Sequence, residues 1–512
     1  MKEKVKTILN KTIYLWEIIC VVLLAIFSYL LMTTKYYNGY WARIYLFPTI
    51  ILSILTIIII IYNVKNNKKR LEMHFLTFMI PIAIFYMVFM LPSYAPDEIS
   101  HIWRTYDISQ GNLFTRQYED GMTKGIDVPK SLSEANHNIL NKYNVLNEVL
   151  TSKADYQETV NVISTAQTYP FILYIPAALV FFIVRLINIP IIWGIYIAKM
   201  VNLIIFLLGG YYAIKKIPFG KYILFTCLFL PMVITQAISL SADSIINTVI
   251  FFYIAYTISL IFQEERINLK QKILYMLLII FISLAKMIYI PLIGLGFLFV
   301  TSKKMGKKSK IIILIIGTLI CCTFVFANYM YTSQLKYEDA MQYNETNNVE
   351  MVGQLKYLMS NPMNYLKMIT NTISTLGGFY INSMIGYRLG WLNINIPDVI
   401  IIIFSALLVI SPLIENNKVA FSKKQKYWVA LLAVGTIILM MTVTYLLWTP
   451  VGNDVAQGIQ GRYLIPILPL VLLVISKKQN YVEIKNIDIK LSIMLSILNA
   501  LTVFVIFEFF IF

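Results

Sequence analysis

LPSYAPDEISHIWR, residues 91–104, ends one apolar segment and opens the only long polar interval in the N-terminal half of the chain. If Pro96 is the first residue of a helix, the two acids that follow it lie in the first turn, where the positive end of the helix dipole favours carboxylates. The same register places Asp97, His101 and Arg104 on one face, at positions i, i+4 and i+7. Capping explains the acids, but it does not require an imidazole and a cation beside them. The stretch is therefore the first candidate functional site.

The composition is that of a membrane protein. Of the 512 residues, 58% are apolar and only 13% are charged, and the mean hydropathy is +0.71. These values exclude an ordinary soluble globular protein. No segment alternates with period two as the strands of a membrane barrel do, so helices are the expected spanning elements. The predicted fold is an all-α polytopic helical bundle of about 13–14 membrane segments, with a large outer loop after the third helix.

Apolar runs long enough to cross about 30 Å of hydrocarbon define the expected spans. They lie at residues 13–33, 42–62, 74–92, 193–213, 220–240, 243–262, 310–331, 396–414, 427–448 and 490–511. Shorter apolar runs lie at residues 170–187, 272–286, 288–301 and 461–476. The expected divisions are an N-terminal hairpin with a basic inner loop (1–72), a transmembrane core that includes the outer loop 93–168 (73–331), a second outer loop (332–395) and C-terminal helices (396–512).

The basic residues predict the topology. The formal net charge is +17, but Lys and Arg are not interleaved with aromatic residues as in a nucleic-acid-binding surface, so no nucleic-acid partner is expected. They cluster instead in short connections, which an excess of positive charge marks as cytoplasmic. The clusters lie at residues 2–11, 65–70, 303–310, 423–426 and 477–478. We expect a multi-pass protein of the plasma membrane with a cytoplasmic N-terminus, and residues 93–168, 332–395 and 449–460 outside.

One stretch conflicts with this topology. Two apolar runs, 170–187 and 193–213, separate the first outer loop from Lys215 and Lys216, which should be cytoplasmic. Two crossings would give the wrong parity. We therefore expect the first run to lie partly in the interface or to dip and return, which leaves 13 full crossings by the same length criterion.

The two outer loops differ in character. The loop 93–168 contains ten acidic residues, six basic residues and two of the three histidines of the chain, and we interpret it as a small folded unit. Its periodic apolar positions, beginning at Ile99, predict an amphipathic helix on the membrane surface. The loop 332–395 contains polar tracts and an apolar run that Gly377 and Gly378 are expected to interrupt.

Three further groups contain ionisable residues at a membrane edge, where such residues are costly and are functional candidates. Asp243 follows a turn between two apolar runs, and a helix cap also explains it. Lys286 lies where two short apolar runs meet, and snorkelling to the interface also explains it. Arg462 follows glycines at a helix mouth and suits a phosphate, although contact with a lipid headgroup is the alternative. With Asp97, all three reach the same outer face under the predicted topology.

These motifs resemble two groups of membrane proteins. An acidic pair at the start of the first large outer loop resembles the GT-C superfamily of polytopic glycosyltransferases, which use polyprenyl-phosphate-linked sugars. The set as a whole resembles, more narrowly, an uncharacterised family of bacterial multi-pass proteins near that superfamily. The match runs from about residue 75 to residue 475, although two helices before the catalytic loop are unusual for GT-C enzymes. Its motifs are Pro96-Asp97-Glu98 with His101 and Arg104, Ser241-Ala242-Asp243 with Asn247, Lys286 with Tyr289 and Pro291, and Gln460-Gly461-Arg462-Tyr463 with Pro466.

The resemblance implies an inverting sugar transfer from a lipid-linked donor to a glycan acceptor of the cell envelope, at the outer face. Asp97 would be the base, and Glu98 would orient the acceptor or, with Asp243, ligate Mg²⁺ or Mn²⁺. Arg462 and Lys286 would hold the donor phosphate.

The remaining motif residues would have supporting roles. His101 and Arg104 would orient the carboxylates, and Gln460 and Tyr463 would complete the substrate-binding motif. The expected partners are thus the lipid-linked donor, the glycan acceptor and membrane lipid. A transporter or flippase for lipid-linked glycans, and a non-catalytic scaffold, are the alternatives.

Overall fold

The computed structural model describes residues 70–151, 154–298, 306–415, 417–478, 484 and 486–511. The predicted spans 13–33 and 42–62 lie outside the described residues. In chain order the helices are α3 (Leu71–Phe89), α4 (Glu98–Ser109), α5 (Lys130–Ser133), α6 (Tyr143–Thr151), η1 (Thr165–Thr168), η2 (Phe171–Leu173), α7 (Ile175–Leu186), α8 (Ile191–Lys216), α9 (Lys221–Leu228), α10 (Pro231–Ala237), α11 (Ala242–Phe262), α12 (Leu269–Ala285), η3 (Met287–Phe297), α14 (Lys307–Thr332), α15 (Glu338–Thr346), α16 (Met351–Ser360), α17 (Met363–Ile385), α18 (Asp398–Ile410), η4 (Ser411–Leu413), α19 (Lys423–Trp448), η5 (Gly461–Leu464), α20 (Leu468–Ile475) and α21 (Ile487–Ile511).

The strands are few and short. β1 (Ile126–Pro129) pairs antiparallel with β2 (Thr159–Val162), with Ile126 opposite Val162. β3 (Arg388–Leu389) pairs antiparallel with β4 (Ile394–Asn395). The chain is therefore an all-α polytopic membrane protein, as predicted, and the strands only close loops.

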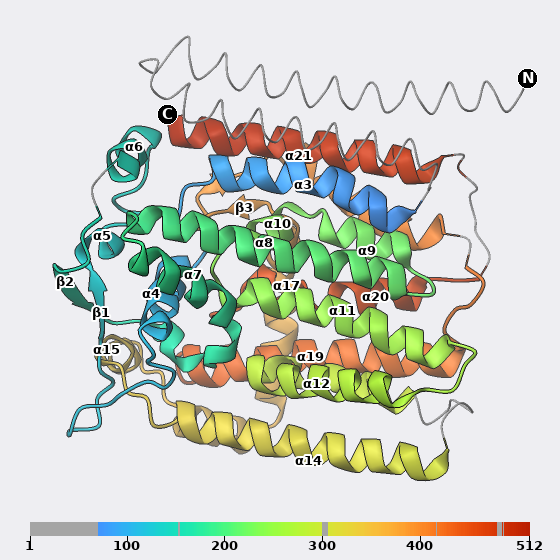
Figure 1. The fold of residues 1–512 in the computed structure, drawn as a ribbon. Coiled ribbons are helices and arrows are strands. Elements are labelled where there is room, and N and C mark those ends of the chain that lie inside the picture. Colours follow the sequence, from blue (N-terminus) through green and yellow to red (C-terminus); the bar gives the residue numbers. More distant parts are fainter. Residues whose placement is uncertain are drawn as a thin grey trace, which may run out of the picture.

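Six described helices are long and apolar enough to cross a membrane: α3, α8, α11, α14, α19 and α21. Their axes run side by side in Figure 1. One end of the bundle carries α4, α5, α6 and the β1–β2 pair, and we call it the site end. The predicted number of crossings stays a prediction, because several of the remaining apolar helices are short.

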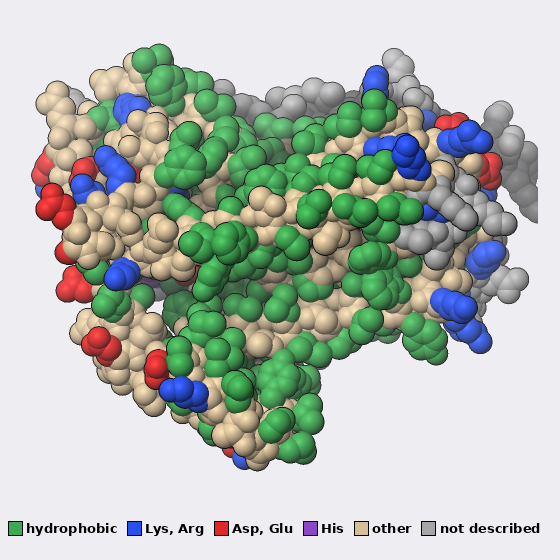
Figure 2. All heavy atoms as spheres, turned by 90° about the horizontal axis from the view of Figure 1, so that it is seen from below, with side chains coloured by type: hydrophobic (Ala, Val, Ile, Leu, Met, Phe, Trp, Pro, Cys, Tyr) green, Lys and Arg blue, Asp and Glu red, His purple; other side chains and the backbone are tan. Residues whose placement is uncertain are grey.

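The opposite end of the bundle carries the basic connections, and we call it the basic end. Lys215 and Lys216 end α8, and Lys423 and Lys424 begin α19. Figure 1 places both of these helix ends away from α4. Figure 2 shows a broad apolar band between an end rich in Lys and Arg and an end where the acidic side chains gather. The lysines that end α8 and begin α19 thus share one end of the described bundle.

The predicted span 220–240 is wrong as a single helix. The structure divides it into α9 and α10. Pro231 is the first residue of α10, and Leu230 before it is extended, with φ −65° and ψ 135°. A proline lacks the N–H that would continue the α9 ladder, and it disfavours helical backbone at the residue before it.

The run 170–187 does not form a full-length span. Its main helix, α7, has 12 residues, and at 1.5 Å per residue it is too short to cross the hydrocarbon. α7 lies beside α4 along its length: the Tyr174 hydroxyl is 2.7 Å from Nδ1 of His101, and Nη2 of Arg185 donates to the carbonyl of Ser109 over 3.1 Å.

α4 is not the exposed surface helix that its periodicity predicts. Ten of its 12 residues are buried, including the charged Glu98, Arg104 and Asp107. These charges are tolerated because each has a partner inside the protein, such as the 2.6 Å pair of Arg104 with Asp107. The helix is therefore a core element of the site end.

The second outer interval is largely helical, with α15, α16 and α17. The predicted interruption at Gly377 and Gly378 is wrong, because α17 continues through both residues and ends at Ile385, before Gly386, which has φ +131°. Glycine weakens a helix but does not by itself end one. The result is a 23-residue helix that contacts η5.

Polar bonds join the helices of the core. The Tyr86 hydroxyl of α3 donates to Oδ1 of Asn499 in α21 over 2.8 Å. The amide of Asn499 donates in turn to the carbonyl of Phe229 over 2.9 Å, at the break between α9 and α10. Inside a membrane such bonds satisfy backbone groups that a helix break exposes. They fix the broken helix against the two spans.

Candidate functional site

Asp97 lies in a strained turn at the start of α4. The helix begins at Glu98, so Asp97 is the N-cap residue and not part of the first turn, and its φ of +62° is in the left-handed region. Its side chain forms no cap. Instead it accepts a 2.5 Å hydrogen bond from Nη2 of Arg462, and it is 47% exposed. Left-handed backbone at a residue other than glycine costs free energy and is enriched at functional sites.

Glu98 faces the opposite way and is fully buried. Its Oε2 accepts the backbone N–H of Ala95 over 3.3 Å, and its own N–H donates to the carbonyl of Ala95 over 3.0 Å. Its Oε1 accepts the N–H of Leu240 over 3.0 Å and lies 3.3 Å from Nζ of Lys199. Glu98 therefore closes the turn that holds Asp97 and ties this turn to the loop before α11.

Lys199 was not predicted from the sequence. It lies in α8 with 1% of its side chain exposed, and it neutralises Glu98. The available signal was its position as a lone cation inside an otherwise apolar run, since such residues are functional candidates by default.

Asp243 connects the two cations of the site. It lies in the first turn of α11, where the N-cap Ser241 accepts its N–H. Its Oδ1 is 3.0 Å from Nζ of Lys286, and its Oδ2 is 3.6 Å from Nε of Arg462. The side chains of Asp243 and Arg462 are 8% and 5% exposed, so both are buried behind Asp97.

Arg462 reaches the Asp97 turn from the C-terminal part of the chain. Besides Asp97, its Nη1 donates to the carbonyl of Pro96 over 2.9 Å. Gly461 allows this approach, because a Cβ there would lie 2.3 Å from the carbonyl oxygen of Tyr380 and 2.6 Å from the N–H of Met384 in α17. The structure thus brings Asp97, Asp243, Lys286 and Arg462 together from four separate segments.

Aromatic rings surround Lys286. Its Nζ lies 4.1 Å from the ring centroid of Tyr463 and 5.8 Å from that of Tyr169. The Tyr289 hydroxyl donates to the carbonyl of Tyr463 over 3.0 Å, and the N–H of Tyr463 donates to the carbonyl of Gln460 over 3.0 Å. Tyr463 therefore contacts the cation, as a member of the predicted motif, whereas Tyr169 was not predicted.

His101 lies next to the charged cluster but pairs with Tyr174. Burial lowers the pKa of His101 to about 4, against the opposing influence of the Asp97 and Asp243 carboxylates. The imidazole is therefore neutral at physiological pH. The neutral imidazole bonds to Tyr174 beside the charged cluster and adds no charge to it.

Arg104 does not orient the carboxylates of the motif, contrary to the sequence prediction. Its guanidinium donates to Asp107 and to the carbonyls of Asn112 and Leu113, over 2.6, 3.1 and 2.6 Å. Its i+7 position from Asp97 places it almost two turns farther along α4, where it fixes the turn after the helix.

A metal ion shared by Glu98 and Asp243 does not fit this arrangement. Glu98 is paired with Lys199, and Asp243 is paired with Lys286 and Arg462. Within the described part of the chain, no group of three or more His, Cys, Asp or Glu residues is placed to hold a metal ion. Divalent cations require several oxygen ligands, so we assign no step to Mg²⁺ or Mn²⁺.

Fold and site define a helical membrane protein with a cluster of two acids and two bases at one end of its bundle, in which Asp97 is half exposed and Asp243 and Arg462 are buried. The chain belongs to the family described as "Predicted membrane protein (DUF2142)", which matches residues 82–471. The matched region contains Asp97, Asp243, Lys286 and Arg462. No curated protein and no solved structure matches the chain.

Proposed function

We propose that the chain is a membrane glycosyltransferase that moves a sugar from a polyprenyl-phosphate donor to a cell-envelope glycan at the outer face of the plasma membrane. The observation that carries the proposal is the contrast in exposure within the site. Asp97 is half exposed, whereas Asp243 and Arg462 behind it are buried. One carboxylate thus faces incoming substrate, and the cations lie directly behind it.

The distribution of basic residues supports the orientation. The Lys-rich ends of α8 and α19 lie at the basic end, and positively charged loops are retained in the cytoplasm. The site end then faces outward. A polyprenyl-phosphate donor places its headgroup at this depth, and its chain remains in the hydrocarbon.

The proposed reaction uses two groups of residues. Asp97 accepts the proton of the acceptor hydroxyl while the oxygen of that hydroxyl forms a bond to the anomeric carbon of the sugar. The bond from that carbon to the phosphate oxygen breaks, and its electron pair leaves with the phosphate. Arg462 and Lys286 stabilise the charge that develops on this leaving group.

The contacts of the site suit this exchange. Asp97 and Arg462 bond to each other, so neither charge lacks a partner. When the Asp97 carboxylate turns toward the acceptor, Nη2 of Arg462 becomes available for the phosphate. The resemblance to GT-C enzymes supports the same assignment. A transporter for lipid-linked glycans would instead require charges along a path through the bilayer.

The test is sugar transfer by the purified full-length protein. The protein is incubated in nanodiscs with labelled polyprenyl-phosphate sugars and envelope glycans, and the released polyprenyl phosphate is measured. Asp97→Asn should lower turnover by about 10²–10⁴-fold, because it removes the proton acceptor.

Asp454→Asn is the matched control. Asp454 is 45% exposed, close to the 47% of Asp97, and it is also paired with a cation, Lys367. This variant should retain full turnover. Equal activity of Asp97→Asn and the parent protein would reject the assignment of Asp97 as the base.

A further inference from the structure

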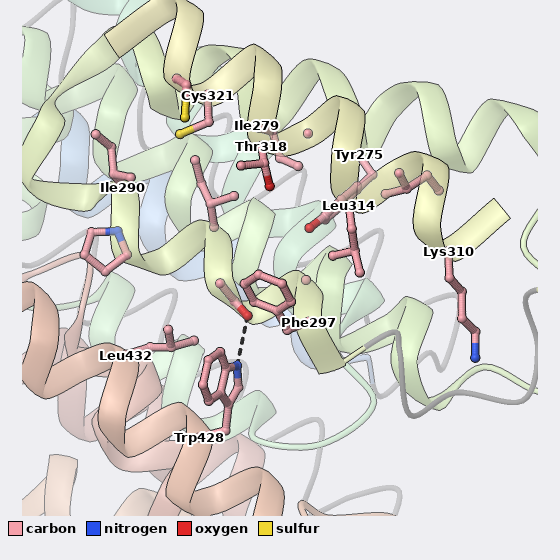
Figure 3. Close-up of a pocket in the computed structure, with 17 residues that line it drawn as sticks. Tyr275, Ile279, Ile290, Phe297, Lys310, Leu314, Thr318, Cys321, Trp428 and Leu432 are labelled. Atoms are coloured by element: carbon pink, nitrogen blue, oxygen red, sulfur yellow. Dashed lines mark hydrogen bonds between the residues drawn. The ribbon is translucent and has the colours of Figure 1, made fainter. Parts of the chain in front are cut away.

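A pocket of about 420 Å³ lies beside η3, between α12, α14 and α19, and we call it the η3 groove. Figure 3 shows Ile279, Ile290, Leu314, Phe297 and Leu432 around it. Its lining is almost entirely apolar, with Lys310 at the edge nearest the basic end. Apolar concave sites of this size bind apolar molecules or parts of molecules.

The groove begins next to the charged cluster. Lys286 immediately precedes η3, and Ile290 and Pro291 are the first η3 residues that line the groove. At about 2 Å per residue in a 3₁₀-helix, Ile290 lies about 8 Å and Phe297 about 22 Å beyond Lys286 along the axis. On its other side η3 is fixed to the site, because the Tyr289 hydroxyl donates to the carbonyl of Tyr463.

The outer wall of the groove is a helix with little attachment to the bundle. Only 6% of the apolar stretch of α14 is buried, against 78% for α11. Gly317 of α14 faces the groove, and a Cβ there would have its nearest contact at 3.6 Å, with Ile279. The groove therefore has room beside α14, and it adjoins the apolar, mostly unburied surface of that helix.

We propose that the η3 groove binds the hydrocarbon chain of the polyprenyl phosphate whose phosphate lies at Lys286 and Arg462. This inference rests on the proposed function for the identity of the lipid. η3 begins directly after Lys286 and lines the groove from Ile290 to Phe297, which favours entry of the chain from the site end. The other conceivable occupant is a membrane phospholipid with its phosphate at Lys310. The experiment below distinguishes this phospholipid from the polyprenyl phosphate.

The experiment is photo-crosslinking of the full-length protein in nanodiscs with a polyprenyl phosphate that carries a diazirine in its chain. We expect crosslinks on η3 and α14 residues of the groove. Gly317→Phe, which fills the groove, should lower crosslinking at least tenfold. Leu319→Phe, at a 61% exposed position of α14 that does not line the groove, should leave it unchanged. If Gly317→Phe is not stably folded, Cys321→Phe on the same wall replaces it.

The outcomes separate the occupants. Lys286→Met should lower crosslinking more than Lys310→Met does, because the phosphate is proposed to lie at Lys286. The reverse order would overturn the inference, as would equal crosslinking of Gly317→Phe and Leu319→Phe. So would competition for the crosslink by unlabelled phosphatidylglycerol that is as strong as competition by unlabelled polyprenyl phosphate. Crosslinks in the groove without any sugar transfer would contradict the proposed glycosyltransferase activity and still support the lipid site.

Discussion

At the scale of single residues, the pair of Glu98 and Lys199 sets the position of Asp97. Both side chains are buried, at 0% and 1% exposure, and Glu98 also accepts two backbone N–H groups from separate loops. Removing one partner of such a pair leaves an uncompensated charge in an apolar interior. The left-handed turn at Asp97 depends on this pair, although neither side chain faces the open side of the site.

Lys199→Met should therefore lower the free energy of unfolding by about 3–5 kcal/mol. The measurement is thermal or chemical unfolding in mild detergent. The double variant Glu98→Gln/Lys199→Met, which removes both charges, should recover much of the loss. Lys130→Met, which breaks the exposed pair of Lys130 with Glu158, should have no measurable effect. Wild-type stability of Lys199→Met would contradict the role of the pair.

His101 should make stability depend on pH. Its pKa is about 4 in the folded protein, because of burial, against about 6.5 when unfolded. Between these values the unfolded state binds more protons than the folded state. The contribution of His101 to stability is therefore complete above pH 6.5 and is lost as the pH falls through about 4. The loss from this group amounts to about 3 kcal/mol.

The check is to compare the parent protein with His101→Gln across pH 4–7. The variant should show a smaller loss of stability on acidification, because the other titrating groups act equally in both proteins. Identical pH profiles would show that His101 does not titrate in this range.

At the scale of elements, the apolar runs predict the continuous helices well. α3, α8, α11, α14, α19 and α21 all fall on predicted spans, because burial or lipid contact requires long apolar stretches. The breaks are less predictable. Pro231 divides a predicted span because it removes a backbone donor, whereas Gly377 and Gly378 only weaken the helix and do not interrupt it.

Part of the site could also be predicted from the sequence. Asp97, Asp243, Lys286 and Arg462 were identifiable because charged residues at membrane edges are rare. The roles of Glu98 and Arg104 were not, because the direction of a side chain depends on where its helix begins. The shift of the α4 start from Pro96 to Glu98 turns Asp97 outward and Glu98 inward.

The contact of η5 with α17 is the element-scale feature that positions Arg462. Gly461→Ala should push η5 away from the α17 backbone, since its Cβ would lie 2.3 Å from the carbonyl oxygen of Tyr380. We expect a loss of about 1–3 kcal/mol in unfolding free energy. The proposed transfer should fall with it, because Arg462 moves away from Asp97. Unfolding and turnover are measured together.

Gly378→Ala, in the helix α17 that η5 contacts, is the control. A Cβ at Gly378 would meet nothing within 4 Å, and alanine favours a helix over glycine. This variant should be at least as stable as the parent protein. If the two alanine variants behave alike, the tight packing of Gly461 does not position the arginine.

At the scale of the whole molecule, charge is separated along the bundle. The basic end carries the Lys-rich helix ends, and the site end carries the loops in which acids outnumber bases by ten to six over residues 93–168. From the Lys-rich helix ends, the positive-inside rule predicts that the site end is extracellular. The proposed use of an envelope glycan requires that orientation, because the acceptor lies outside the cell.

Labelling of introduced cysteines tests the predicted orientation of the bundle in the membrane. Asn138→Cys, at an exposed position of the site end, should react with a membrane-impermeant maleimide in intact cells, whereas Lys424→Cys, exposed at the basic end, should react only after permeabilisation. The parent chain gives the background from its native cysteines. The opposite pattern would place the acid–base cluster in the cytoplasm. Transfer to an external glycan would then be excluded, whatever the chemistry of Asp97, because acceptor and base would lie on opposite sides of the membrane.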